Sequence, residues 1–295
     1  MSRAEPRPAA APHPIPYQGS KRRLAAAILA HAPGRVCRLI EPFAGSAAVS
    51  LAAASRDLAA RYCIADRLGA LAALWRAILD HPDHTADAYE RLWRAQHADA
   101  ASHYRAVRAR FNRTGDPVAL LYLLARCVKN AVRFNGAGQF NQGADHRRAG
   151  VRPPRMRREI ARASALLADR AEVVAADYAE LLADASPGDL VYLDPPYQGV
   201  SGSRDPRYIA PLDLDRFVGQ LDALNRRRVP FLVSFDGSSG GRTYGAALPA
   251  ELRLRRVWLR AGRSSQATLV GRVAETVESL YLSPGLAGSR RAAGR

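Results

Sequence analysis

Apolar segments of strand length alternate with helical segments along most of this chain. VCRLI, ARYCIA, AEVV and DLVYL each come before a stretch with helical spacing, and VPFLVSF follows the helical stretch LDLDRFVGQLDALNRRR. This alternation predicts an α/β fold, a parallel sheet with helices on both faces. Near the start of the chain, Ser20 is placed to cap a helix over Arg22 to Ala32. No internal repeat is visible.

One long polar interruption divides the α/β pattern. Residues 81–126 have helical spacing, and residues 128–154 are rich in Gly, Asn and Arg, which favours an inserted loop or hairpin. We therefore expect one domain formed by residues 14–80 and 156–284, with residues 81–155 inserted into it. Residues 1–13 and 285–295 are rich in Pro, Ala, Gly and Arg, and their composition predicts disordered tails.

The charge balance indicates an anionic partner. The 295 residues include 44 Lys and Arg against 27 Asp and Glu, a net charge of +17. Residues 126–162 alone hold ten basic and two acidic residues, as expected of a contact surface. Nucleic acid is the first candidate, because basic side chains gain free energy by displacing the counterions condensed on phosphates.

Several classes of protein are disfavoured. The longest uncharged runs, such as 117–125, are about half the ~18 residues that a membrane-spanning helix needs. The first residues lack the apolar stretch of a signal peptide, so we expect a cytoplasmic protein without membrane contact. Cys37, Cys63 and Cys127 are far apart, with no CxxC and no nearby pair of histidines. They favour three buried reduced thiols, without a disulfide framework or a metal site.

A glycine turn and a later aspartate suggest a nucleoside site. In the segment 41–49, EPFAGSAAV, Gly45 stands where a strand turns into a helix, so backbone amides can approach a ligand closely. The segment matches neither G-x-G-x-x-G nor the phosphate-binding loop G-x-x-x-x-G-K-[ST]. Asp66 ends the next strand, where a carboxylate can accept both hydroxyls of a ribose. A helix cap is the alternative role for Asp66.

The strongest local motif is Asp194-Pro195-Pro196-Tyr197, directly after the apolar strand LVYL. Two prolines cannot donate ladder hydrogen bonds, so the strand ends there with a rigid tip. Asp194 and the Pro195 carbonyl can both accept hydrogen bonds from an exocyclic amino group. Tyr197 offers a ring on which a planar base can stack.

Taken together, these motifs resemble those of a known family. PYQGSKRRL, EPFAGSAAV, IADR, RFNGAGQFNQG, LDPPY and FLVSFDG occur in the order found in N6-adenine DNA methyltransferases of the alpha group, the family that includes DNA adenine methylase. The similarity covers residues 15–283. It implies a Rossmann-like methyltransferase sheet that uses S-adenosylmethionine as cofactor, with a target-recognition domain inserted at 81–155.

The resemblance implies roles for particular residues. The cofactor-binding set would be Tyr17, Lys21, Glu41, Pro42, Phe43, Gly45, Asp66, Asp177 and Asp194, and the catalytic set Asp194, Pro195, Pro196 and Tyr197. Lys21 would lie near the methionine carboxylate and Asp66 would hold the ribose. Asp177 would contact the adenine amine of the cofactor, and an N-cap for the helix that follows is the alternative.

The inserted hairpin would contact DNA. The candidate residues are Arg133, Phe134, Asn135, Asn141, Arg147 and Arg148. Arg133 would read a guanine edge or hold a phosphate, and Phe134 would wedge into the base stack beside an extruded adenine. Packing of the hairpin is the alternative role for both. The segment 261–272 resembles that of restriction-associated members, which implies a cognate restriction endonuclease as a possible further partner.

The function that the resemblance implies is site-specific DNA adenine-N6 methylation, for restriction-modification or genome marking. The enzyme would flip the adenine out of duplex DNA, because N6 cannot align with the methyl group inside the stack. Two alternatives remain open. An RNA adenine-N6 methyltransferase would use the same motif, and a catalytically silent DNA-binding protein would keep the scaffold without the reaction.

Overall fold

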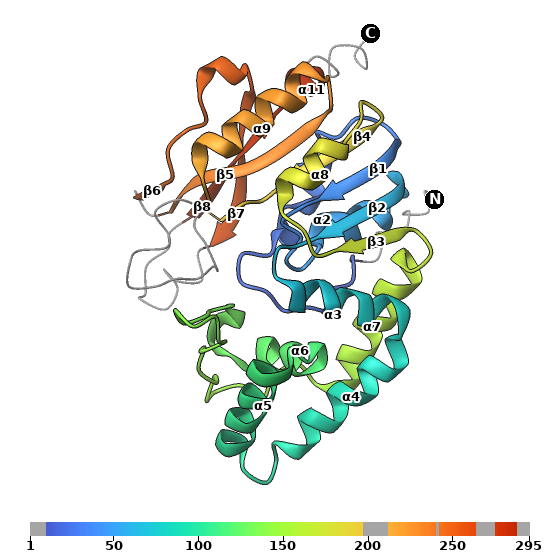
Figure 1. Cartoon of the computed structure of the whole chain (residues 1–295), viewed down its shortest axis with the longest axis vertical. Coiled ribbons are helices and arrows are strands. Elements are labelled where there is room, and N and C mark those ends of the chain that lie inside the picture. The colour runs from blue at the N-terminus through green and yellow to red at the C-terminus, as the bar shows by residue number, and fades with distance from the viewer. Residues whose placement is uncertain (1–9, 197–211, 240–241, 264–274, 288–295) are drawn as a thin grey trace, which may run out of the picture.

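The computed structural model describes residues 10–196, 212–239, 242–263 and 275–287 of the chain. Its centre is one sheet of eight strands, in the order β3-β2-β1-β4-β5-β8-β7, with β6 paired to β5 (Figure 1). The strands are β1 (Val36–Glu41), β2 (Ala59–Ala65), β3 (Ala171–Val174), β4 (Asp189–Leu193), β5 (Phe231–Ser239), β6 (Arg242–Tyr244), β7 (Arg255–Arg263) and β8 (Glu275–Leu282). The predicted α/β fold is confirmed.

The sheet is mixed, whereas the alternation predicts a parallel sheet. β3, β2, β1, β4 and β5 pair in parallel, whereas β8 pairs antiparallel with both β5 and β7. β7 and β8 are consecutive strands, and neighbours of this kind pair antiparallel without a crossover helix. Because β8 lies between β5 and β7, it brings its own residues close to the centre of the sheet.

Helices cover both faces of the sheet, and each face has its own apolar core. The α-helices are α1 (Ala25–Leu29), α2 (Ala48–Ala54), α3 (Gly69–Asp80), α4 (Pro82–Ala95), α5 (Ala100–Thr114), α6 (Pro117–Arg126), α7 (Pro153–Leu167), α8 (Tyr178–Asp184), α9 (Leu214–Arg226) and α11 (Pro284–Ala287). One core contains Leu39 and Tyr62 with α1, α2 and α3. The other contains Ile40 and Cys63 with α8 and α9. Alternate residues of one strand therefore point to opposite cores.

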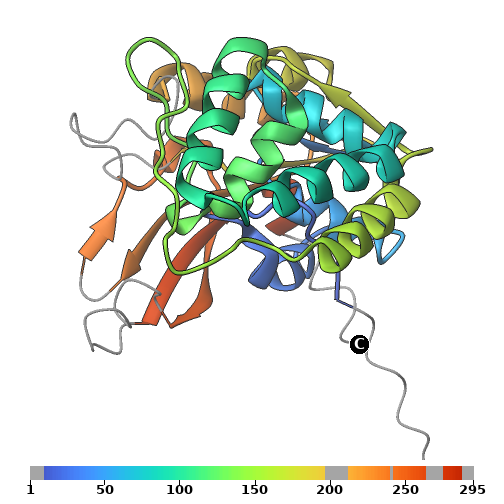
Figure 2. The same cartoon turned by 90° about the horizontal axis from the view of Figure 1, so that it is seen from below.

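The inserted region stands apart from the sheet. α4, α5 and α6 lie below the sheet in Figure 1, and α7 leads the chain back to it. Figure 2 shows the segment that follows α6 on the side of the molecule where β6, β7 and β8 lie. α7 packs against α3 of the sheet domain and against α4 of the insert, so it contacts both parts of the molecule.

The first and last described residues contact the rest of the domain. The His13 amide donates to Glu159 at 2.8 Å, and Ile15 is fully buried. At the other end, Leu286 of α11 is buried. Residues near both ends of the described chain thus contact other elements, and most of the two expected tails, 1–9 and 288–295, lie outside the described residues.

The helix expected over residues 22–32 is also shorter than predicted. A 3-10 helix, η1 (Lys21–Arg23), precedes α1, and the Ser20 side chain does not cap it. Ser20 instead accepts a hydrogen bond from the Ser46 hydroxyl at 2.8 Å. This contact ties the start of the chain to the segment between β1 and α2.

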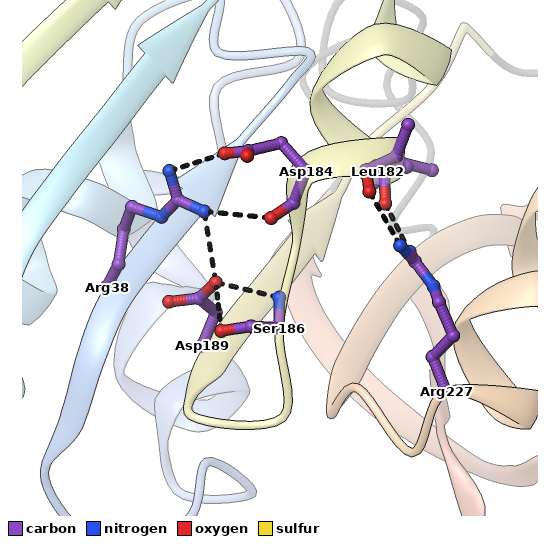
Figure 3. Close-up of polar contacts among 7 residues, drawn as sticks. Arg38, Leu182, Asp184, Ser186, Asp189 and Arg227 are labelled. Atoms are coloured by element: carbon purple, nitrogen blue, oxygen red, sulfur yellow. Dashed lines mark hydrogen bonds and ion pairs between the residues drawn. The ribbon is translucent and has the colours of Figure 1, made fainter.

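A polar cluster fixes the amino ends of β1 and β4, at the edge of the sheet opposite to the DPPY motif. Arg38 donates to Asp184 at 2.9 Å and to Asp189 at 3.1 Å, and Asp189 also accepts from the Ser186 amide (Figure 3). β1 and β4 are thereby held side by side where their chains enter the sheet.

Within the described ranges, no helix is long and apolar enough to cross a membrane. All three cysteines are free, with Cys63 and Cys127 buried, but Cys37 is exposed. The expectation of three buried thiols is therefore wrong for Cys37, which lies on the outer part of β1, where the strand is not yet covered.

Candidate active site

The candidate site lies at the point in the sheet where the order of the strands reverses, between β1 and β4. β1 pairs with β2 on one side and with β4 on the other, so the chain connections diverge between β1 and β4. In open α/β sheets, ligands bind at such a point, outside the carboxyl ends of the strands. Glu41 ends β1 and Asp194 follows β4 directly, so both carboxylates lie at this edge.

Gly45 is held from three sides in the turn after β1. Its amide donates to the Asp66 carboxylate at 3.1 Å, and its carbonyl accepts from the Trp75 indole at 3.0 Å. A Cβ at Gly45 would lie 3.2 Å from the Tyr17 ring, and its φ of +51° favours glycine. The structure thus brings Tyr17, Gly45 and Asp66 together. Trp75 of α3 also supports this turn through its bond to Gly45. Sequence reasoning missed Trp75, because a tryptophan within a helical pattern gives no indication of such a contact.

The Asp66 carboxylate joins the turn after β1 to the segment that leads into α3. One oxygen accepts from the Leu68 amide at 2.9 Å, at the start of α3, while the other accepts from Gly45. Burial raises the pKa of Asp66 to about 6, although the Leu68 and Gly45 amides oppose this shift. Each carboxylate oxygen has a second lone pair, so Asp66 can still accept hydrogen bonds from a ligand.

Glu41 is buried and binds the first turn of α2. Its carboxylate accepts hydrogen bonds from the amide and the hydroxyl of Ser50, within the first turn of that helix. Burial raises the pKa of Glu41 to about 7, the Ser50 hydrogen bonds oppose the shift, and the charge of Asp194 adds to it. The contacts of Glu41 therefore hold the loop that contains Pro42, Phe43 and Gly45 against α2.

Lys21 and Asp194 form an ion pair across 173 residues of chain. The ammonium lies 2.6 Å from Asp194 Oδ2, and the Lys21 side chain is only 5% exposed. A second carboxylate, Glu278 of β8, lies 3.7 Å from the same ammonium. Burial raises the pKa of Asp194 to about 6, against the attraction of Lys21. The resemblance places Lys21 near a cofactor carboxylate, whereas here it pairs with the motif aspartate.

Asp177 caps a helix in this structure. Its side chain forms a capping box with Glu180 at the start of α8 and an ion pair with Arg216 at 2.9 Å. Asp177 therefore has the N-cap role that the sequence analysis gives as the alternative to cofactor binding. Next to it, the Phe43 ring lies 5.2 Å from the Tyr178 ring, and the buried Tyr178 hydroxyl has no hydrogen-bond partner among the described residues.

The remaining motif residues are divided between described and undescribed parts of the chain. Pro195 is buried and Pro196 is partly exposed, directly after β4. Tyr197, expected to stack on the base, lies outside the described residues. In the region that the structure does describe, no group of three or more metal-ligating side chains occurs.

The hairpin of the insert is organised by packing. Phe134 is only 8% exposed, and its ring lies 6.0 Å from Phe140, which in turn contacts Phe111 of α5. The Asn135 side chain accepts from the Ala137 and Gln139 amides and so shapes the turn. In this structure Phe134 has the packing role that the sequence left as an alternative, because apolar contacts to α5 outweigh exposure of the ring.

Some of the basic side chains in this region already have partners within the protein. The Arg148 guanidinium lies 2.6 Å from Asp145, and Arg157 pairs with Asp87 of α4. Arg126 is buried and donates to the Asp145 carbonyl at 2.9 Å. Arg133 is partly buried, while Asn141 and Arg147 are exposed. The local charge count therefore overstates how much of it is available to a partner.

A basic depression lies between α5 and the hairpin. The charge count over residues 126–162 misses it, because its arginines lie on α5. The depression is lined by Arg105, Arg108, Ala109, Asn112, Arg113 and Gln139. None of its three arginines has an ion pair with any residue in the described parts of the chain. The sequence could have indicated this basic surface, because the spacing of Arg105, Arg108 and Arg113 places them on one side of a helix.

The fold is that of an α/β protein with a candidate site at the carboxyl ends of its central strands, and comparison with known proteins gives the family. The chain belongs to the D12 class N6 adenine-specific DNA methyltransferases, whose family model matches residues 17–214. The chain is 29% identical over 191 residues to the retron Ec67 DNA adenine methylase of Escherichia coli, covering 63% of each chain.

Two further relatives agree with this assignment. DNA adenine methylase of Escherichia coli K12 is 28% identical over 64% of this chain and 66% of its own length. The DNA N-6-adenine-methyltransferase of Escherichia phage P1 is 26% identical over 68% of this chain and 27% of its own length. The present chain thus spans 63% and 66% of the length of the first two relatives.

Proposed function

We propose that this protein is a site-specific DNA methyltransferase that transfers the methyl group of S-adenosylmethionine to N6 of adenine in duplex DNA. The observation that carries the proposal is the position of Asp194. In a chain of this family, the motif aspartate lies at the carboxyl end of β4, beside the Gly45 turn and Asp66. A base-binding acceptor and a nucleoside-binding turn thus share one edge of the sheet.

The residues present fit the cofactor. Gly45 leaves no room for a Cβ beside Tyr17, and Asp66 offers carboxylate oxygens next to that turn. The Tyr178 hydroxyl, which has no hydrogen-bond partner in the described part of the chain, lies beside Phe43 and adds a polar group to an aromatic wall that suits adenine. When bound, S-adenosylmethionine supplies an electrophilic methyl group on a sulfonium cation. Glu41 and Asp194, whose charges act on each other at this edge of the sheet, provide negative charge for a cationic ligand.

Asp194 and the Pro195 carbonyl would act on the target base. Above about pH 6 the Asp194 carboxylate is ionised and accepts a hydrogen bond from the amino group, which draws electron density towards N6. Two prolines after β4 hold these acceptors rigidly, so little reorganisation is needed as positive charge develops on N6. The adenine must leave the duplex first, because N6 in the stack cannot meet a methyl donor in line.

The basic depression of the insert would hold the DNA backbone. Arg105, Arg108 and Arg113 line it, and no acidic side chain contributes to its wall. The hairpin is anchored beside it by Asn112, which exchanges two hydrogen bonds with the backbone of Phe140 at 2.8 and 3.0 Å. Phosphates here would fix the register of the duplex, while hairpin residues such as Arg133 and Asn141 would contact bases.

A direct experiment is to incubate the purified protein with S-adenosylmethionine and unmethylated plasmid DNA, and then to map modified bases by long-read sequencing. We expect N6-methyladenine at one short motif. Asp194→Ala should abolish methylation and leave duplex affinity within about twofold of the wild type, because Asp194 does not line the basic depression proposed to hold the backbone. Normal methylation by this variant would refute the assignment.

Other outcomes separate the alternatives. Methylation of RNA but not of duplex DNA would favour an RNA adenine-N6 methyltransferase. Duplex binding without cofactor binding would favour a catalytically silent DNA-binding protein. A restriction endonuclease as partner stays a prediction, since most of the segment 261–272 on which it depends lies outside the described residues.

A further inference from the structure

Three elements meet at one buried ammonium. Lys21 of η1 is 5% exposed, and its Nζ lies 2.6 Å from Asp194 after β4 and 3.7 Å from Glu278 of β8. Nζ also donates to the Gly19 carbonyl at 3.2 Å. The first carboxylate is within hydrogen-bond distance, whereas the second is about 1 Å beyond it.

Glu278 reaches this point because β8 approaches β5 closely. Glu278 pairs in register with Gly237 of β5, next to a register shift between Ser234 and Gly237. A Cβ at Gly237 would lie 2.6 Å from the Val277 carbonyl oxygen, so only glycine allows this approach. The FDG segment therefore brings Glu278 across β5 towards the end of β4.

The ion pair conflicts with the proposed role of Asp194. An ammonium at 2.6 Å from Oδ2 occupies one acceptor site of Asp194 and offsets much of the charge of the carboxylate that must accept from the target amine. Moving a buried ammonium away from its partner without a second anion would be costly. Glu278 is that second anion, and a shift of about 1 Å would bring Nζ within hydrogen-bond distance of it.

We propose that Glu278 is a positioning residue that takes over the Lys21 ammonium when the amino group of the target adenine binds Asp194. This inference rests on the proposed function, and it concerns a residue outside the recognised motifs. In the free protein Lys21 neutralises Asp194. In the complex with DNA, Lys21 turns to Glu278, and the full charge of Asp194 faces the amine.

The first test compares Glu278→Gln with wild type in single-turnover methylation of a plasmid-derived duplex that the wild type methylates. We expect the rate to fall about tenfold, with unchanged affinities for S-adenosylmethionine and duplex. The described charged groups around Asp194 are Lys21, Glu41 and Glu278. Because the charge of Glu278 raises the pKa of Asp194, the acidic limb of the rate profile should move to lower pH in the variant.

A matched control is Glu172→Gln, on the exposed surface of β3 at the far edge of the sheet. It should keep the wild-type rate and pH profile. A Glu278→Gln variant with an unchanged rate and an unchanged acidic limb would overturn the proposal. So would a lower rate with an unmoved limb and reduced thermal stability, since that pattern indicates a structural role only. If the wild type itself methylates nothing, the proposed function fails instead.

The second test observes Lys21 without methyl transfer. Lys21 and Lys129 are the only lysines in the chain, so protein labelled with ¹³C-lysine has two sets of Cε signals, which Lys129→Arg assigns. With S-adenosylhomocysteine bound, adding the duplex should shift the Lys21 signal in the wild type. The signal should stay near its free position in Glu278→Gln. A Lys21 signal that the duplex leaves unmoved in the wild type would also overturn the proposal.

Discussion

At the scale of single residues, the site is notable for acids that are held out of water. Glu41, Asp66 and Asp194 lie at one edge of the sheet, and burial raises the pKa of each to between about 6 and about 7. Only Asp194 has a lysine beside it among the described residues. Such a group of acids costs stability once all are ionised, and a functional site that binds a cation would recover part of that cost.

Glu41 provides a stability test of this description. Its pKa is raised from 4.5 to about 7, so its contribution favours folding below about pH 4 and is lost as the pH rises through 7. Glu41→Gln keeps an acceptor for Ser50 but cannot ionise. We expect the unfolding free energy to decrease less between pH 5 and pH 8 in the variant, by on the order of 3 kcal/mol. Urea denaturation at both pH values measures this, and equal decreases in the two proteins would contradict it.

At the scale of elements, contacts with α5 hold the polar hairpin of the insert in place. Phe134 packs on Phe140, Phe140 packs on Phe111 of α5, and Asn112 of the same helix binds the backbone of Phe140. The hairpin and α5 thus form one unit that borders the basic depression. The aromatic residues supply the apolar contacts, and Asn112 sets the register.

Asn112→Ala tests this unit. The variant lacks two hydrogen bonds to the Phe140 backbone, so the hairpin should exchange its amides faster and its position beside the depression should loosen. We expect duplex affinity to fall about tenfold with cofactor affinity unchanged. Fluorescence anisotropy and hydrogen exchange measure the two effects. Wild-type affinity together with a protected hairpin would show that Asn112 does not position it.

At the scale of the whole molecule, a net charge of +17 predicts strongly salt-dependent association with DNA. The structure divides that charge into arginines used in internal ion pairs and arginines that line a depression. Arg157 belongs to the first group, since it pairs with Asp87 and lies 3.5 Å from Glu90. Arg105, Arg108 and Arg113 belong to the second group.

The salt dependence of binding distinguishes these two groups. Replacing Arg105 and Arg108 together by Ala should weaken binding to any duplex sequence and reduce the slope of log K against log salt by about 2, since each arginine would neutralise roughly one phosphate. Arg91→Ala is a suitable control, because Arg91 is exposed on α4, away from the depression. An unchanged slope in the double variant would exclude the depression as a phosphate site.

Neighbouring residues in the sequence are enough to specify the local parts of this protein. Prolines after LVYL end β4 at Asp194, and Gly45 makes the turn after β1, because strand termination and turn geometry depend on adjacent residues. The same locality explains why the strand and helix order could be predicted. The bond from the Leu68 amide to Asp66 is local in the same sense, because it joins residues two positions apart.

Which distant residues meet is settled only by the folding of the whole chain. The pairing of Lys21 with Asp194, the approach of Glu278 through an antiparallel β8, and the burial of Phe134 all join residues from separate elements. No periodicity encodes such contacts, because they depend on the order of strands in the sheet and on which apolar faces pack together. The sequence therefore specifies the chemical groups of the site, whereas packing of the whole chain sets their partners and their charge.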